Sequence, residues 1–276
     1  MIAPARVGRD GALCLGFERH GPATVLATCR SVLPLQVLAP VALADAAAVV
    51  SMLNPTGGVL GGDRLTIDID VGRDAHACLT TPSATRVYRA AGEPAVQRVR
   101  LTLAPGAVVE WVPDHTIPSA GAALCQTLEV GAGAGATLIA VDAFAAGRVA
   151  RGEAWRFARL ESALTVRDAA GLVLHDRFVL GGGEAWRGLG FAEGRPYFAT
   201  VVLVTDTGVD DVLAELLAAV AGIDGAAVGA ARLPRRGALL RCLAASAPAL
   251  TDVLEVVWTL ARRRLLRLPP LALRKL

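Results

Sequence analysis

Short alternating segments separated by turn residues are the feature that most constrains the fold of this chain. Up to about residue 139, runs rich in Val, Leu, Ile and Thr are separated by turns that contain Gly or Pro. In residues 65–71 the apolar side chains fall at every second position, which is the period of a strand with one buried face. Strands at such short intervals predict an all-β sandwich, barrel or solenoid. The predicted strands of this part are residues 11–18, 24–30, 65–71, 76–81, 95–103, 108–112, 124–130 and 137–141.

A turn followed by a strand recurs roughly every 30 residues, a spacing typical of repeat architectures. Copies of this unit begin at Gly72, Ala104 and Gly131. In a solenoid each repeat packs only on its neighbours along the chain. The spacing favours a solenoid-like arrangement of the strands.

The C-terminal third changes from strands to helices. The strand pattern resumes at residues 155–160, 162–168, 172–179 and 197–205. Residues 209–221 then carry an apolar stripe at helical spacing, with Asp210 and Asp211 in the first turn, where negative charge favours the helix dipole. A second helix is predicted at residues 248–268, and a strand at 238–244 lies between the two helices. Elsewhere, only residues 42–52 suggest a helical period.

These patterns predict one domain over residues 1–276, because no linker or break in composition divides the chain. The domain has a strand-rich part at 1–205 and a helix-containing part at 206–276. The expected fold is mainly β, a solenoid-like arrangement of many short strands with two α-helices in the C-terminal third.

Composition narrows the possible partners and the compartment. Lys and Arg number 28 against 25 Asp and Glu, a balance that gives no electrostatic reason to expect a nucleic-acid partner. No apolar stretch reaches the ~20 residues of a spanning helix, and residues 1–10 lack the apolar run of a signal peptide. The five scattered cysteines, without a Cys-x-x-Cys pair, suit a reducing compartment. We therefore expect a cytoplasmic protein without a membrane partner.

The glycine-rich loop at residues 54–63 reads Asn-Pro-Thr-Gly-Gly-Val-Leu-Gly-Gly-Asp. A phosphate-binding loop would end in Gly-Lys-Ser/Thr, and a dinucleotide loop would open a helix. This loop ends in Asp63 and opens a strand, so neither fingerprint fits. The glycine pairs predict tight turns that deliver the Asp63 carboxylate to a strand entrance.

Other polar residues in apolar surroundings are candidates for chemistry. Asp142 and Asp176 stand in otherwise apolar strands, where a carboxylate either faces solvent or is buried and paired. Arg148 and Arg151 are the available partners of Asp142. The hydroxyl-rich loop at residues 80–89 is a solvated turn, an anion-binding loop or the lining of a polar passage.

A metal site has weaker support. His76 and Cys78 lie two residues apart, hence on one face of a predicted strand, and are possible ligands of a borderline metal. A stable site needs three or four such ligands, and the four histidines do not cluster in the sequence. No stable metal site is expected.

Several sequence blocks in fixed order carry a family resemblance. Beside the loop at 54–63 they include Leu-Thr-Thr-Pro-Ser-Ala-Thr-Arg-Val-Tyr-Arg at 79–89, Glu-Trp-Val-Pro-Asp at 110–114 and Gly-Arg-Val-Ala-Arg-Gly-Glu at 147–153. Shorter matches lie at 34–37 and 239–243. Together these blocks span almost the whole chain, and the chain resembles the UreD family of urease accessory proteins, also called UreH.

The resemblance implies a function without catalysis. Proteins of this family are scaffolds that bind the helical protein UreF, and through it the GTPase UreG, and that dock on apo-urease during nickel delivery. The resemblance also implies a polar internal channel and no tightly bound cofactor, with transient nickel contacts at Asp63, Thr85, Asp142 and Asp176. Thr85 and Asp176 stand where other members carry Ser and Glu, which keeps an oxygen ligand. The family's C-terminal Pro-Arg-x-Trp element does not occur in residues 271–276.

Two other functions stay open at this point. One is a β-solenoid hydrolase that uses Asp63 and Asp142 as acid and base, which requires both carboxylates in one open, aromatic-lined cleft. The low aromatic content of 4% argues against a sugar platform. The other is an interaction module whose channel carries nothing.

Overall fold

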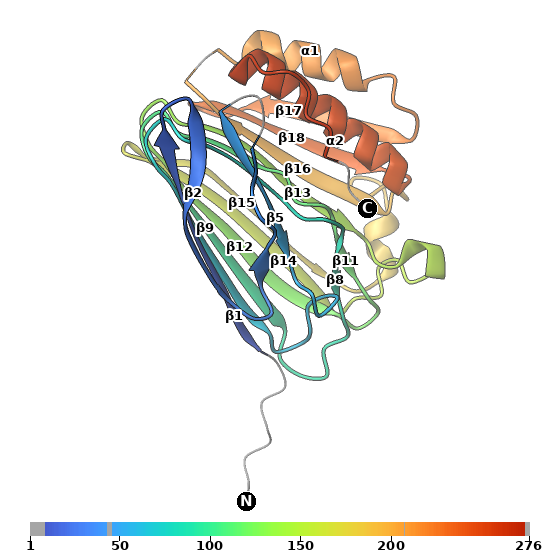
Figure 1. The fold of residues 1–276 in the computed structure, drawn as a ribbon. Coiled ribbons are helices and arrows are strands. Elements are labelled where there is room, and N and C mark those ends of the chain that lie inside the picture. The colour runs from blue at the N-terminus through green and yellow to red at the C-terminus, as the bar shows by residue number, and fades with distance from the viewer. Residues whose placement is uncertain (1–8, 43–45, 207, 274–276) are drawn as a thin grey trace, which may run out of the picture.

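Two facing β-sheets and a pair of helices make up the described part of the chain (Figure 1). The computed structural model describes residues 9–42, 46–206 and 208–273. Within these residues, sheet 1 has seven strands and sheet 2 has eleven. In spatial order, sheet 1 contains β15 (Gly171–Gly181), β14 (Arg159–Asp168), β12 (Ala123–Ala132), β9 (Ala95–Leu103), β6 (Arg64–Val71), β1 (Asp10–His20) and β2 (Ala23–Val32).

Sheet 2 lies against the helices. Its main path runs through β17 (Ala226–Arg232), β18 (Gly237–Ala244), β16 (Tyr197–Val204), β13 (Thr137–Ala145), β10 (Val108–Trp111), β7 (His76–Thr80), β5 (Ala47–Leu53) and β3 (Gln36–Val37). Three short strands pair beside this path: β4 (Val41–Ala42), β8 (Thr85–Val87) and β11 (Thr116–Pro118).

The central strands form a parallel solenoid. The chain passes from β6 to β7, from β9 to β10 and from β12 to β13, changing sheets each time. The short turns that join these pairs stack on one another: Asp74 N–H donates to Pro105 O (3.3 Å), and Gly106 N–H donates to Ala134 O (2.9 Å). The predicted recurrence of a turn and a strand is therefore confirmed, and so is the mainly β, solenoid-like fold. The third turn lies at residues 133–136 because β12 extends to Ala132.

The central strands of sheet 2 are buried on both faces. On β13, Leu138 and Ala140 belong to the core between the sheets, whereas Ile139 and Val141 belong to the core beneath the helices. A strand covered on both sides has no need to alternate apolar and polar residues. The strands of sheet 2 accordingly read as continuous apolar runs.

The helices cover the outer face of sheet 2 (Figure 1). Helix α1 (Asp210–Val220) carries Asp210 and Asp211 in its first turn. Helix α2 (Ala247–Ala261) begins after Ser246, whose Oγ accepts a hydrogen bond from Ala249 N–H. A π-helical turn, η3 (Arg262–Leu266), extends α2 and ends at Arg267, where φ is 57°. Both predicted helices are confirmed, and the strand predicted at 238–244 corresponds to β18.

Two sequence predictions about secondary structure are wrong. Residues 47–53 of the suggested helix at 42–52 form strand β5, because burial on both faces removes the alternation that marks a strand; residues 43–45 lie outside the described residues. The strands predicted at 155–160 and 162–168 are one strand, β14. Residues 155–158 form a loop in which Trp155 has φ of 64°, a conformation that a strand excludes. Short 3₁₀ turns occur at η1 (Val149–Arg151) and η2 (Glu184–Arg187).

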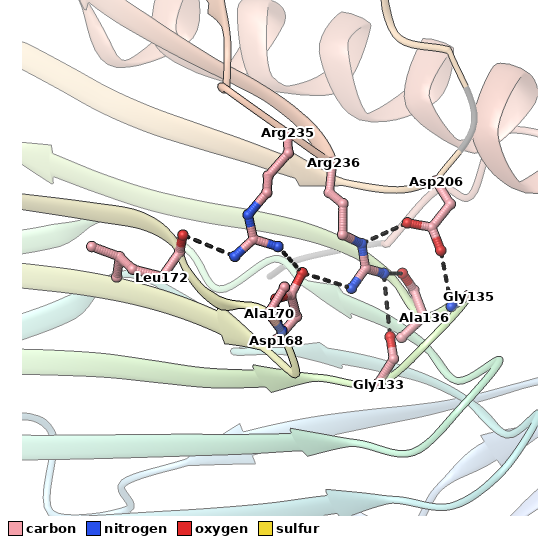
Figure 2. A network of polar contacts seen from close by, with 9 residues as sticks. All are labelled: Gly133, Gly135, Ala136, Asp168, Ala170, Leu172, Asp206, Arg235 and Arg236. Carbon is pink, nitrogen blue, oxygen red and sulfur yellow. Dashed lines mark hydrogen bonds and ion pairs between the residues drawn. The ribbon is translucent and has the colours of Figure 1, made fainter.

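A polar network ties the β17–β18 hairpin to the solenoid turns (Figure 2). Arg235 pairs with Asp168, at the end of β14, and donates to Leu172 O at 2.9 Å. Arg236 donates to Gly133 O (3.2 Å) and Ala136 O (3.1 Å) in the third solenoid turn. These contacts fasten the end of sheet 2 to sheet 1. No helix in the described part of the chain is long and apolar enough to cross a membrane.

Candidate functional site

Asp142 makes the first of two polar bridges between the sheets. It lies on β13 and faces sheet 1, where Gln126 Nε2 donates to its Oδ1 and Ser162 Oγ donates to its Oδ2, each at 2.7 Å. Gln126 on β12 and Ser162 on β14 are register partners, and their side chains also hydrogen-bond each other at 3.1 Å. The carboxylate is therefore held between the sheets by two donors from adjacent strands.

The surroundings of Asp142 shift its titration toward neutral pH. Burial raises its pKa from 3.8 to about 6, the hydrogen bonds from Ser162 and Gln126 oppose the rise, and the charge of Asp176 adds to it. Desolvation disfavours the charged form of a carboxyl group, which explains the direction. The predicted partners Arg148 and Arg151 are not its hydrogen-bond partners in the structure, because Arg148 pairs with Glu153 at 2.5 Å.

Asp176 and Arg241 make the second bridge. Asp176 lies on β15, the edge strand of sheet 1, and its Oδ1 is 2.5 Å from a guanidinium nitrogen of Arg241 on β18. In sheet 2, Asp142 pairs in register with Thr200, and Thr200 pairs with Arg241. In sheet 2 the residues of the two bridges therefore lie in one row, whereas in sheet 1 Ser162 pairs with Phe178 and Asp176 pairs with Leu164.

Two cavities meet at Asp142. The larger, which we call the aromatic cavity, has a volume of ≈ 520 Å³ and is lined by aromatic side chains together with Asp142 and Arg241. Its aromatic lining residues are Phe144, Trp155, Phe178, Trp186, Phe191 and Phe198. The smaller, which we call the inner cavity, has a volume of ≈ 90 Å³; Thr85, Gln126 and Asp142 are among its lining residues. Two of the four predicted channel residues, Thr85 and Asp142, thus share one cavity.

Asp63 occupies a different environment. It is 2% exposed, and its two carboxylate oxygens accept hydrogen bonds from Arg9 N–H (2.9 Å) and Leu60 N–H (2.8 Å). A Cβ on Gly61 would lie 2.7 Å from Ala90 Cα, so the loop requires glycine there. The predicted position of Asp63 at a strand entrance is correct, but the described residues that line the two cavities do not include it. Its carboxylate secures the loop.

His76 and Cys78 lie on the opposite face of sheet 2, beneath α2. His76 Nε2 is 2.7 Å from Glu110 Oε1, and Trp258 Nε1 donates to Glu110 Oε2 at 2.6 Å. The Arg262 guanidinium also contacts Glu110. Burial opposes ionisation of Glu110, but His76 and Arg262 hold the pKa of Glu110 below its ordinary value. His76 therefore belongs to a buried ionic cluster that joins α2 to the sheet.

Sequence reasoning missed this cluster and the second bridge. No group of three or more His, Cys, Asp or Glu side chains is placed to hold a metal among the described residues. One feature of the sequence could have indicated the cluster: Glu110 is a charged residue inside the apolar strand β10. Arg241 gave the same signal in β18.

Comparisons with known proteins agree on one family. A family model described as UreD urease accessory protein matches residues 9–275. A urease accessory protein UreD of Alkalilimnicola ehrlichii is 33% identical over 269 residues, 97% of this chain and 91% of the relative. The UreD protein of Deinococcus radiodurans is 34% identical over 99% of this chain and 98% of its own. That of Klebsiella aerogenes is 34% identical over 78% and 80%.

Proposed function

Since this chain belongs to the UreD family of urease accessory proteins, we propose that it is a non-catalytic urease maturation factor through which nickel reaches apo-urease. In this proposal it works in the cytoplasm as a scaffold that binds UreF, and UreG through UreF. Nickel is its cargo and is bound only in transit. The protein carries no tightly bound cofactor.

The position of Asp142 carries the proposal. Its carboxylate lines both the aromatic cavity and the inner cavity, so an ion that passes from one to the other meets it. A passage requires oxygen ligands that release a divalent ion, rather than a closed cage of nitrogen and sulfur ligands that retains it. Asp142 and the Thr85 hydroxyl are ligands of that kind. Because its pKa is about 6, Asp142 is mostly ionised at pH 7 and above, the form that binds a cation.

Asp63 has another part in this proposal. Its carboxylate oxygens accept hydrogen bonds from two backbone N–H groups, and these bonds hold the glycine-rich loop at 54–63 in its conformation. Replacing Asp63 would then reduce activation through the shape of this loop. The same geometry weakens the hydrolase alternative, which requires Asp63 and Asp142 in one cleft.

The test is urease activation in cells that express the urease subunits and accessory proteins with variants of this chain. Asp142→Asn removes the charge, and Thr85→Val removes the hydroxyl at nearly constant volume. We expect each to lower the nickel content and activity of urease at least several-fold, while UreF still co-purifies with the variant. Asp70→Asn is the matched control, because Asp70 is an exposed side chain of β6.

Normal activation by both Asp142→Asn and Thr85→Val would refute the passage. That outcome, with UreF still bound, would favour the interaction module without metal transit. Loss of the complex with UreF in Asp142→Asn would also contradict the proposal, because it would assign Asp142 to assembly.

A further inference from the structure

Arg241 separates the aromatic cavity from an acidic side chain. It lines this cavity, and its guanidinium lies 2.5 Å from Asp176 Oδ1. Among the described residues that line the cavity, Arg241 is present and Asp176 is absent. The Asp176 side chain is only 15% exposed, whereas that of Arg241 is 57% exposed. The guanidinium therefore covers the carboxylate on the cavity side.

The location of this ion pair relates it to Asp142. Asp176 comes from β15, the edge strand of sheet 1, and Arg241 comes from β18, which lies next to the edge strand β17 of sheet 2. Asp142 lies in the same row of sheet 2 as Arg241, with Thr200 between them, and the charge of Asp176 reaches Asp142. Asp142 and Glu193 already line this cavity, and Glu193 is paired with Arg195. Without Arg241, the Asp176 carboxylate would be added to them, and a divalent cation would be held more tightly.

We propose that Arg241 is a resident counter-cation that competes with the cargo cation for Asp176 and so keeps binding at the cavity weak. A divalent cation that enters the aromatic cavity displaces the guanidinium from Asp176, and the guanidinium returns when the cation moves on to Asp142. Exchange is easy because a partly exposed ion pair contributes little net stability. This inference rests on the proposed function and adds a residue that sets how long the ion stays.

A purely structural tie between the sheets is the competing explanation, and Arg177 supplies the control. Arg177 is the neighbour of Asp176 on β15, and it pairs with Glu161 at 2.6 Å. Its side chain is 50% exposed, close to that of Arg241. Arg177→Gln removes the same charge from the opposite face of the strand, although its ion pair lies within sheet 1 and Glu161 keeps Arg159 as a partner.

The experiment is a calorimetric titration of nickel chloride into the purified full chain. We expect Arg241→Gln to bind Ni²⁺ at least tenfold more tightly than the wild type, and Arg177→Gln to stay within twofold. The double variant Arg241→Gln/Asp176→Asn should lose the gain, because the uncovered carboxylate is then gone. If Arg241→Gln does not fold, Arg241→Met keeps the long stem and gives the same test.

Two results would overturn the inference: an affinity of Arg241→Gln within twofold of the wild type, or a gain that survives Asp176→Asn. Failure of the passage itself is seen separately. Normal urease activation by both Asp142→Asn and Thr85→Val would refute the passage while leaving the calorimetric competition at Asp176 intact. Conversely, Arg241→Gln could leave the Ni²⁺ affinity unchanged while Asp142→Asn fails to activate urease. That result would support the passage and show that Arg241 has no part in it.

Discussion

Replacing Asp142 by Asn should stabilise the protein, by an amount that depends on pH. The Asp142 carboxyl has a pKa of about 6 in the folded chain against an ordinary value of 3.8. Each pKa unit corresponds to about 1.4 kcal/mol, so ionised Asp142 costs the folded state up to about 3 kcal/mol. Asn has no charge to desolvate. Its amide can still accept from Gln126 and donate to Ser162, which preserves the bridge between the sheets.

The sign of the pH dependence follows from proton binding. Between pH 3.8 and about 6 the folded state holds a proton on Asp142 that the unfolded state has released. The free energy of unfolding of the wild type therefore falls as the pH rises through this window, and the full penalty is present above it. Below pH 3.8 both states are protonated and the penalty disappears.

Urea unfolding of the wild type and of Asp142→Asn at several pH values tests this reasoning. Allowing about 1 kcal/mol for hydrogen bonds that Asn makes less well, we expect a gain of about 1–2 kcal/mol at pH 8. The gain should vanish or reverse near pH 4.5. Asp70→Asn should show no such pH-dependent gain. A destabilisation of Asp142→Asn that is equal at pH 8 and pH 4.5 would refute the assignment of a desolvated carboxylate.

Two further predictions concern carboxylates with structural contacts. Asp63→Ala should lower the free energy of unfolding by about 1–3 kcal/mol in urea, because it removes the carboxylate that accepts from the backbone N–H groups of Arg9 and Leu60; a change below about 0.5 kcal/mol would contradict that role. Glu110→Gln should cost about 3–5 kcal/mol in the same assay, because the buried Arg262 guanidinium then loses the charge of the Glu110 carboxylate. Glu215→Gln, at the more exposed pair with Arg264, is its control and should change little.

The sequence predicts the solenoid because the residues that determine each repeat are close together in the sequence. A turn and the strand after it lie within a few residues, so Gly72, Ala104 and the glycines after Gly131 mark the repeats directly. Strand β5 is not predicted in this way, because both its faces are buried and its sequence lacks the alternation of apolar and polar residues. Strand β17 is not predicted either, because Ala and Gly, which have low strand propensity, make up most of the segment. There the pairing with β18 decides the conformation.

The candidate site is only half predictable for a related reason. The sequence identifies Asp142 as a carboxylate in an apolar strand, but its partners Gln126 and Ser162 lie 16 and 20 residues away on other strands. Asp176 and Arg241 are separated by 65 residues. Such pairs follow from the stacking of the sheets and from strand register, which local periodicity does not specify. The nearby arginines at 148 and 151 were therefore the wrong partners to expect.

Asp142 and Asp63 differ in what their burial does for the fold. At Asp63, two backbone N–H donors replace water around the carboxylate, and these hydrogen bonds hold the loop at 54–63 in place. Asp142 meets only two neutral side-chain donors, and burial still shifts it toward the protonated form. An amide at position 142 would satisfy the same bridge without that cost. Some residues lower the stability of a protein even though a neutral side chain of the same shape would fit. Such residues are typically kept because the function requires them. The cost of the carboxylate at 142 is therefore in keeping with the passage that we propose, and the fold alone does not require it.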